Sequence, residues 1–168
     1  MKVSEIMTRR FESVREDGNL LEAMALLRES LKVGDEVGIK CVVVLDTEDR
    51  MCGVLPQSDV GRELLYPYFV RDLAGARAER PEFLPADFEA LGAWARRLTV
   101  RDVMTRDPVT IGPGGTGFEA ADLLLRHRIK ALPVVEGGSV VGIVYRSSLY
   151  RRLAESVLES SPSPAEQG

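Results

Sequence analysis

The sequence contains few residues of the kinds that form disulfides or bind transition metals. Its 168 residues include two cysteines and one histidine. Cys41 and Cys52 both lie in apolar, strand-like segments, which favours reduced, buried thiols over a disulfide or a metal site. His127 follows a predicted helix, where a polar side chain can cap the last carbonyls. Without a second histidine or clustered acidic residues, we expect no metal site.

Long hydrophobic runs and a surplus of basic residues are also absent. No apolar run reaches the roughly 18 residues that a membrane span needs, and the segment 1–5 lacks a signal-peptide core, so we expect a cytoplasmic protein. The net charge is −4, whereas a nucleic-acid-binding domain usually carries a basic surplus. We therefore expect neither a membrane nor a nucleic acid as partner.

The sequence offers no arrangement of residues that would support catalysis. No nucleophile has an identifiable base. The segment Gly112-Pro113-Gly114-Gly115 looks like a phosphate-binding loop but lacks the Lys-Ser/Thr that would follow it, so we interpret it as a turn. We expect that the protein is not an enzyme.

The dominant feature that is present is an internal repeat. The segment Val3–Thr8 returns as Val100–Thr105, and the offset of 97 residues holds without a gap to Leu27 and Leu124. Among these 25 pairs, 9 are identical. Two copies predict two similar units related by a pseudo-twofold axis, with a ligand site at the seam between them.

Each repeat has the same predicted order of elements, β-α-β-β-α. Asn19 with Glu22, and Thr116 with Glu119, have the spacing of an N-cap residue and a carboxylate three positions later. An apolar hairpin follows each of these helices, and a second helix begins near Ser58 or Ser147. The pattern predicts an α+β fold of two such units. The expected strands are 13–14, 39–45, 51–55, 109–111, 129–135 and 140–144.

The repeats divide the chain into four parts. Residues 1–60 and 100–155 are the repeats, and residues 156–168 form a polar tail that we expect to be disordered. The linker, 61–99, is too long for a simple loop, so we expect it to be partly helical, with a helix from Pro85 through Arg97. Its aromatic residues could anchor an interface or cover the protein's own core; they are Tyr66, Tyr68, Phe69 and Trp94.

Several short motifs recur in the same order in both repeats. In the second repeat they are Val100–Thr105, Pro108–Thr110, His127–Val135 and Gly142–Val144. In the first they are Ile6–Thr8, Gly53–Leu55 and Ser58–Val60. With these motifs the chain resembles a tandem pair of CBS domains, also called a Bateman module.

The resemblance implies a regulatory role without a required cofactor. Such pairs hold adenosine-containing ligands in the clefts between the repeats, so AMP, ADP, ATP and S-adenosylmethionine are the expected ligands. They often form homodimers. Because no effector domain fits in this chain, ligand binding would shift a conformational equilibrium that a separate partner protein reads.

The family's ligand signature is a Thr or Ser at the end of the second hairpin strand and an Asp three residues later. The Asp accepts hydrogen bonds from the two ribose hydroxyls. In the first repeat these positions hold Pro56 and Asp59, and in the second they hold Tyr145 and Ser148. The resemblance therefore implies at most one nucleotide, near Asp59. The alternative is that Asp59 only stabilises a helix N-terminus, with Ser58 as its cap.

Lys40 and Lys130 occupy equivalent positions on the strand that lines the family's cleft with small residues. They could bind ligand phosphates, with Arg146 as a further candidate, or they could be solvated lysines at a strand edge. The full set of expected ligand-binding residues is Lys40, Cys41, Pro56, Ser58, Asp59, Thr110, Lys130, Ala131, Tyr145 and Arg146. The rival hypothesis is a ligand-free CBS pair that acts only as a dimerisation or interaction module.

Overall fold

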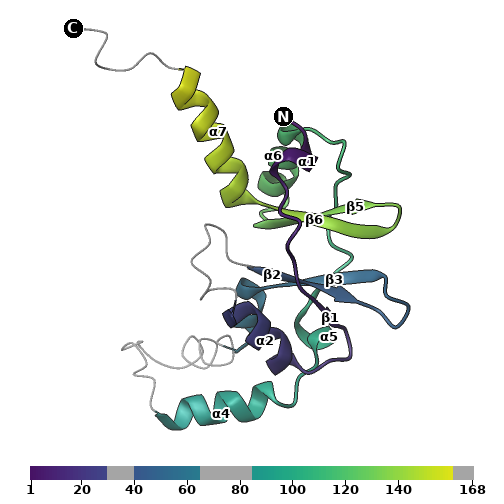
Figure 1. Ribbon diagram of the computed structural model, residues 1–168. Helices are drawn as coiled ribbons and strands as arrows, with labels where there is room; N and C mark the ends of the chain where they lie inside the picture. The colour runs from purple at the N-terminus through teal and green to yellow at the C-terminus, as the bar shows by residue number, and fades with distance from the viewer. Residues whose placement is uncertain (30–39, 65–84, 161–168) are drawn as a thin grey trace, which may run out of the picture. The chain divides into compact units, whose positions relative to one another are not determined.

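The computed structural model describes residues 1–29, 40–64 and 85–160 (Figure 1). The described chain divides into two compact units whose boundaries differ from those of the repeats. One unit comprises Glu12–Pro108 and is called the Asp59 unit; the other comprises Met1–Phe11 with Val109–Gly168 and is called the Tyr145 unit. Among the described residues, no helix has the length and apolar character that crossing a membrane requires.

The Asp59 unit is built on a four-stranded sheet. Its strands, in the order β1-β2-β3-β4, are Ser13–Arg15, Cys41–Leu45, Met51–Pro56 and Thr105–Arg106. β1 runs parallel to β2, and the other pairs are antiparallel. The helices of this unit are α2 (Leu20–Glu29), residues 57–64, α4 (Pro85–Ala95) and α5 (Val100–Val103). β2 is a run of mostly β-branched residues, which suits a buried strand, and Val42 and Val44 lie in the core with Leu20 and Leu55.

The Tyr145 unit contains one antiparallel hairpin with helices packed against it. The hairpin pairs β5 (Ala131–Glu136) with β6 (Ser139–Tyr145), and Gly137 and Gly138 supply the positive φ angles of its turn. The helices are α1 (Val3–Ile6), α6 (Gly117–Arg126) and α7 (Arg146–Ser160). In Figure 1, α1 and α6 lie together beside the hairpin, and α7 leads away from the end of β6. The core contains Val3, Ile6, Ala120, Leu124, Leu132, Val134, Val144 and Leu149.

The first motif of each repeat packs in the unit of the other repeat. Met104 and Val100 belong to the core of the Asp59 unit, whereas Val3 and Ile6 belong to the core of the Tyr145 unit. The repeats are therefore intertwined rather than consecutive. The boundaries expected at residues 60 and 100 do not coincide with those of the compact units, because nonlocal packing determines which segments share a core.

A glycine in each hairpin permits this packing. A Cβ atom on Gly53 would lie 2.8 Å from the Thr105 carbonyl oxygen, and one on Gly142 would lie 2.8 Å from the Thr8 carbonyl oxygen. Both distances are too short for a real contact, so only glycine lets the Met-Thr backbone approach the strand. The Thr8 amide also donates to the Ile143 carbonyl at 2.9 Å.

The structure differs from the sequence-based expectations at three places. Residues 109–111 are not a strand; only Ile111 forms a bridge, with Val134. The pair Thr105–Arg106 forms a strand that we did not expect. α7 continues to Ser160, beyond the boundary at residue 155, so residues 156–160 are helical rather than disordered. The local sequence pattern did not predict the pairings of Ile111 and of β4, because each depends on a partner that is distant in the sequence.

The expected linker helix is present as α4, which ends at Ala95 rather than at Arg97. Of the linker aromatics, Trp94 is 41% exposed. Tyr66, Tyr68 and Phe69 lie outside the described residues, as do residues 30–39 of the first repeat and residues 161–168 of the tail.

Candidate functional site around Asp59

Asp59 lies in the first turn of helix 57–64, directly after β3. Among the described residues it is the one charged residue that is buried, with 8% of its surface exposed. Its Oδ2 accepts a hydrogen bond from the Thr105 hydroxyl at 2.7 Å, and its Oδ1 accepts one from Arg62 at 3.1 Å. A buried carboxylate is tolerated when it is paired and hydrogen-bonded, so these donors hold Asp59 in its place.

The open end of the β2–β3 hairpin gathers several of the predicted ligand residues. Cys41 is the register partner of Pro56, and the Gln57 amide donates to the Lys40 carbonyl at 3.0 Å. Asp59 follows within the next helical turn. The Lys40 side chain is exposed, as is Ser58. The structure therefore brings together all five residues predicted from the first repeat.

Cys41 is fully buried at this end of the hairpin. Burial is the main cause that raises the pKa of its thiol, and the negative charge of Asp59 is the second; together they raise the pKa of Cys41 to about 12. A thiol with so high a pKa stays protonated at neutral pH and is a poor nucleophile. Cys41 thus acts as a small packing residue beside the carboxylate.

The Tyr145 unit repeats this backbone geometry with different side chains. Ala131 is the register partner of Tyr145, and the Arg146 amide donates to the Lys130 carbonyl at 3.0 Å, as Gln57 does to Lys40. The Lys130 and Arg146 side chains are exposed, whereas Tyr145 is 1% exposed. Four of the predicted residues meet here, but Ser148 stands where the other unit has Asp59.

The remaining predicted residue, Thr110, lies at a different place in the Tyr145 unit. It is exposed and precedes Ile111, which bridges Val134. Val134 is three residues along β5 from Ala131. Within this unit Thr110 thus lies next to the residue that pairs with the middle of β5, and its expected role in ligand binding stays a prediction.

Sequence reasoning missed the two residues that hold the Asp59 carboxylate. Arg62 is three positions after Asp59, so helical spacing could have found it. Thr105 is 46 residues away and reaches Asp59 only because β4 pairs with β3. Its counterpart in the first repeat, Thr8, instead donates to the Arg10 carbonyl at 3.4 Å. The repeated Met-Thr pair marked Thr105 as a notable residue, but the sequence alone could not show that Thr105 contacts Asp59.

Sequence comparisons find the same two repeats. The profile of the CBS domain matches residues 3–66 and 100–155. An uncharacterized protein of Methanocaldococcus jannaschii, MJ1426, is 28% identical over 152 residues, which cover 83% of this chain and 84% of that protein. Inosine-5'-monophosphate dehydrogenase of Korarchaeum cryptofilum is 43% identical over 56 residues, but the match covers 33% of this chain and 12% of that enzyme.

Solved structures show the same fold. The CBS domain of a membrane protein from Sphaerobacter thermophilus has a TM-score of 0.66 and 29% identity, over 90% of this chain and 86% of that one. CBSX2, a CBS-pair protein from Arabidopsis thaliana, has a TM-score of 0.64 and 22% identity in its complex with AMP, over 93% of this chain and 98% of that one. These likenesses confirm the α+β fold. The chain therefore belongs to the CBS domain family, as a tandem pair of CBS domains.

Proposed function

We propose that this chain is a non-catalytic regulatory CBS pair that binds an adenosine-containing small molecule through Asp59. The observation that carries the proposal is the buried carboxylate, which Thr105 and Arg62 hold at the end of the hairpin. An ionised carboxylate has about four acceptor positions, and these two donors use two of them. The others can accept bonds from the vicinal ribose hydroxyls. The AMP complex of CBSX2 supports this choice of ligand class.

One nucleotide per chain is the proposed stoichiometry. In the Tyr145 unit, Ser148 provides a single hydroxyl instead of a carboxylate, and the buried Tyr145 occupies the position of the signature Thr. The exposed Lys40 side chain of the Asp59 unit is the proposed phosphate contact; Lys130 is its equivalent in the Tyr145 unit, where Arg146 is a further candidate. Ligand binding would then shift the population of the protein's conformations, and a separate effector protein would bind one of these conformations preferentially.

Thermal unfolding with a panel of AMP, ADP, ATP, S-adenosylmethionine and available 2′-deoxy counterparts tests the proposal. A ligand at 100 times its Kd stabilises the folded state by about 2.7 kcal/mol, which corresponds to a rise in Tm of several degrees. We expect a rise with a ribonucleotide and a smaller rise with its 2′-deoxy form. Each variant is compared with its own ligand-free Tm.

Asp59→Asn should abolish the rise, because the amide replaces one acceptor oxygen with a donor. Asp17→Asn is the matched control, since Asp17 is an exposed carboxylate of the same unit; it should respond as the wild type does. Lys40→Ala and Lys130→Ala test the phosphate contacts in the same assay. If no ligand shifts Tm at millimolar concentration, the sensor proposal is wrong.

The second candidate is a CBS pair that acts only through protein–protein contacts. The observation that favours it is an exposed apolar surface on α6 and α7, which include Leu125 at 67% and Tyr150 at 73% exposure. A flat response to the ligand panel together with measurable self-association or partner binding would favour this candidate.

A further inference from the structure

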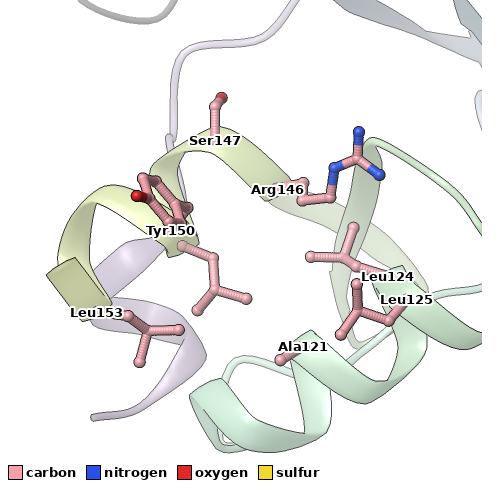
Figure 2. Close-up of a pocket in the computed structure, with 8 residues that line it drawn as sticks. Ala121, Leu124, Leu125, Arg146, Ser147, Tyr150 and Leu153 are labelled. Carbon is pink, nitrogen blue, oxygen red and sulfur yellow. The ribbon is translucent and has the colours of Figure 1, made fainter.

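A groove between α6 and α7 of the Tyr145 unit is lined mainly by apolar side chains (Figure 2). Its volume is about 410 Å³, toward the lower end of the range for small-molecule sites, roughly 300–1,000 Å³. The lining residues are Ala121, Leu124 and Leu125 from α6 and Arg146, Ser147, Leu149, Tyr150 and Leu153 from α7. A groove of this size suits a ligand with a single apolar chain.

The groove has a buried base and exposed apolar walls. Leu124 is fully buried and Leu149 is 4% exposed, whereas Leu125 and Tyr150 are 67% and 73% exposed. In Figure 2, the apolar side chains of α6 and α7 converge on the space between the helices, while Ser147 points away from it. An apolar chain in this space would remove the exposed walls from water, which is a favourable change.

Arg146 is the one charged residue among those that line the groove. Its guanidinium is turned away from the leucines in Figure 2, at the rim of the groove. By contrast, Arg126 on α6 pairs with Asp122 at 2.6 Å, and Arg152 on α7 pairs with Glu155 at 3.5 Å. In the described part of the chain, Arg146 has no carboxylate partner. The rim therefore carries an unpaired positive charge.

A second basic residue lies beside Arg146. The Arg146 amide donates to the Lys130 carbonyl at 3.0 Å, so the two backbones are adjacent. The Lys130 side chain is exposed and likewise has no carboxylate partner among the described residues. The acidic residues of α7, Glu155 and Glu159, lie in the second half of that helix. This end of the groove is thus positively charged and favours an anionic group.

The first repeat shows that the fold does not require the leucine wall of the groove. At the offset of 97 residues, Leu125 corresponds to Arg28. Arg28 is exposed on α2, where it pairs with Glu29 at 3.0 Å. A charged residue is therefore compatible with this position in the fold, and the exposed leucine is specific to the second repeat.

Two further groove residues differ between the repeats. Gln57 and Arg146 are the first residues after the equivalent strands β3 and β6, and the same alignment makes Gly61 the equivalent of Tyr150. A Cβ atom on Gly61 would meet nothing within 4 Å, so packing does not require a side chain there. The first repeat thus lacks both the aromatic wall and the cation at the rim.

We propose that the α6–α7 groove binds a long-chain fatty acid, with the chain along the leucines and the carboxylate at Arg146. A guanidinium offers two parallel N–H donors that match the two oxygens of a carboxylate. The volume of the groove favours a single-chain ligand over a lipid with two chains. This site is separate from Asp59 and requires no nucleotide.

The first test measures the apolar part of the site. The full chain is titrated calorimetrically with octanoate, decanoate and dodecanoate, each below its micelle concentration. Each added CH₂ group should lower the Kd by about fourfold at most. Leu125→Glu should raise the decanoate Kd by roughly 10-fold or more, because it removes an apolar wall and adds a negative charge. The matched control is Ala25→Glu at an exposed position on α2, which should leave the Kd unchanged.

The second test separates the head group from the chain. Arg146→Gln introduces the residue of the first repeat and should raise the decanoate Kd by roughly 10-fold, the effect of losing a charge-assisted hydrogen bond. The Kd of 1-decanol, which has the same chain length and a neutral head, should change little. Arg152→Gln is the control, because Arg152 does not line the groove; it should leave both Kd values unchanged. Circular dichroism checks that each variant is folded.

The proposal is wrong if the Kd does not fall as the chain lengthens, if Leu125→Glu leaves binding intact, or if Arg146→Gln weakens decanoate and decanol equally. It is also overturned if the wild type self-associates in a manner that Leu125→Glu abolishes and decanoate does not displace, because a second copy then occupies the groove. None of these outcomes alters the thermal response to nucleotides that Asp59 should provide, so the two proposals fail separately.

Discussion

The hydrogen bond between Thr105 and Asp59 positions the carboxylate that we propose as the acceptor for the ligand's ribose hydroxyls. Thr105 donates to one oxygen of a nearly buried carboxylate at 2.7 Å, and so positions it. Thr105→Val keeps the side-chain volume but removes the donor. We expect it to lower the free energy of unfolding by about 1–3 kcal/mol, because a buried acceptor loses its partner.

The same variant should weaken ribonucleotide binding, measured by titration calorimetry, since the carboxylate is no longer held in place. Thr105→Ser retains the hydroxyl and should restore both properties. A loss of stability without any change in affinity would show that Thr105 is structural only. Thr8→Val is the repeat-equivalent control and should leave the affinity unchanged, because Thr8 contacts a backbone carbonyl rather than a carboxylate.

The raised pKa of the Cys41 thiol predicts that the folded protein loses stability at alkaline pH. Its pKa is raised from 9.0 to about 12, first by burial and then by Asp59. Above pH 9 the unfolded chain loses this proton while the folded chain keeps it, so the stabilising contribution is complete below pH 9 and declines as pH rises toward 12. At pH 10.5 the loss should reach about 2 kcal/mol.

Urea unfolding of the wild type and of Cys41→Ala between pH 8 and 10.5 measures this effect. The variant is less stable at pH 8, but its stability should fall less steeply with pH. Parallel slopes for the two proteins would contradict the prediction. At neutral pH, folded Cys41 should also resist alkylation by iodoacetamide.

At the scale of elements, Gly53 and Gly142 explain how the Met-Thr segments dock on the hairpins. In Gly53→Ala the new Cβ would lie 2.8 Å from the Thr105 carbonyl oxygen and 2.9 Å from the Met104 sulfur. The backbone must shift, and we expect a loss of about 1–3 kcal/mol in unfolding free energy, typical of overpacking. Gly142→Ala should act similarly through Thr8 and Met7.

Gly61→Ala provides the control for these variants. Gly61 lies in helix 57–64, and a Cβ there would meet nothing within 4 Å, so the change should stabilise the helix by roughly 0.5–1 kcal/mol. Thermal and urea unfolding of the three variants give the comparison. Equal effects at Gly53 and Gly61 would mean that close packing is not the reason for the hairpin glycine.

The elements themselves follow closely from local sequence. The Thr116–Glu119 capping box is present at the start of α6, as the spacing predicted, and both hairpins have the expected strands. At the start of α2, Asn19 instead accepts from the Leu21 amide at 2.8 Å. Such features depend on neighbouring residues, which is why pattern and propensity predict them. The strand at Thr105–Arg106 was not predicted, since two residues carry no periodicity.

At the scale of the whole molecule, the intertwined repeats predict which fragments fold. A fragment of residues 12–108 includes Val100, Val103 and Met104, which lie in the core of the Asp59 unit. A fragment of residues 1–60 follows the repeat boundary but lacks them. We expect cooperative thermal unfolding, followed by circular dichroism, for 12–108 and not for 1–60. Cooperative unfolding of the shorter fragment would mean that the exchanged segment is dispensable.

The sequence by itself determined the family, the α+β class, the order of most elements and the gathering of ligand candidates at the ends of the two hairpins. These properties are encoded in residues close together along the chain, and they appear twice. Asp59 was also identified from sequence as the one acceptor that the signature retains; its role in binding a ligand stays a prediction.

Only the tertiary structure decided which segments share a core and what holds Asp59. The Met-Thr segment of each repeat packs against the hairpin of the other, and Thr105 reaches Asp59 across 46 residues of sequence. The exposure of the apolar side chains on α6 and α7 was likewise not evident from the sequence. An amphipathic helix has the same sequence pattern whether its apolar face is buried or exposed to solvent. Nonlocal packing settles such questions, because burial depends on which distant elements meet rather than on the pattern within one element.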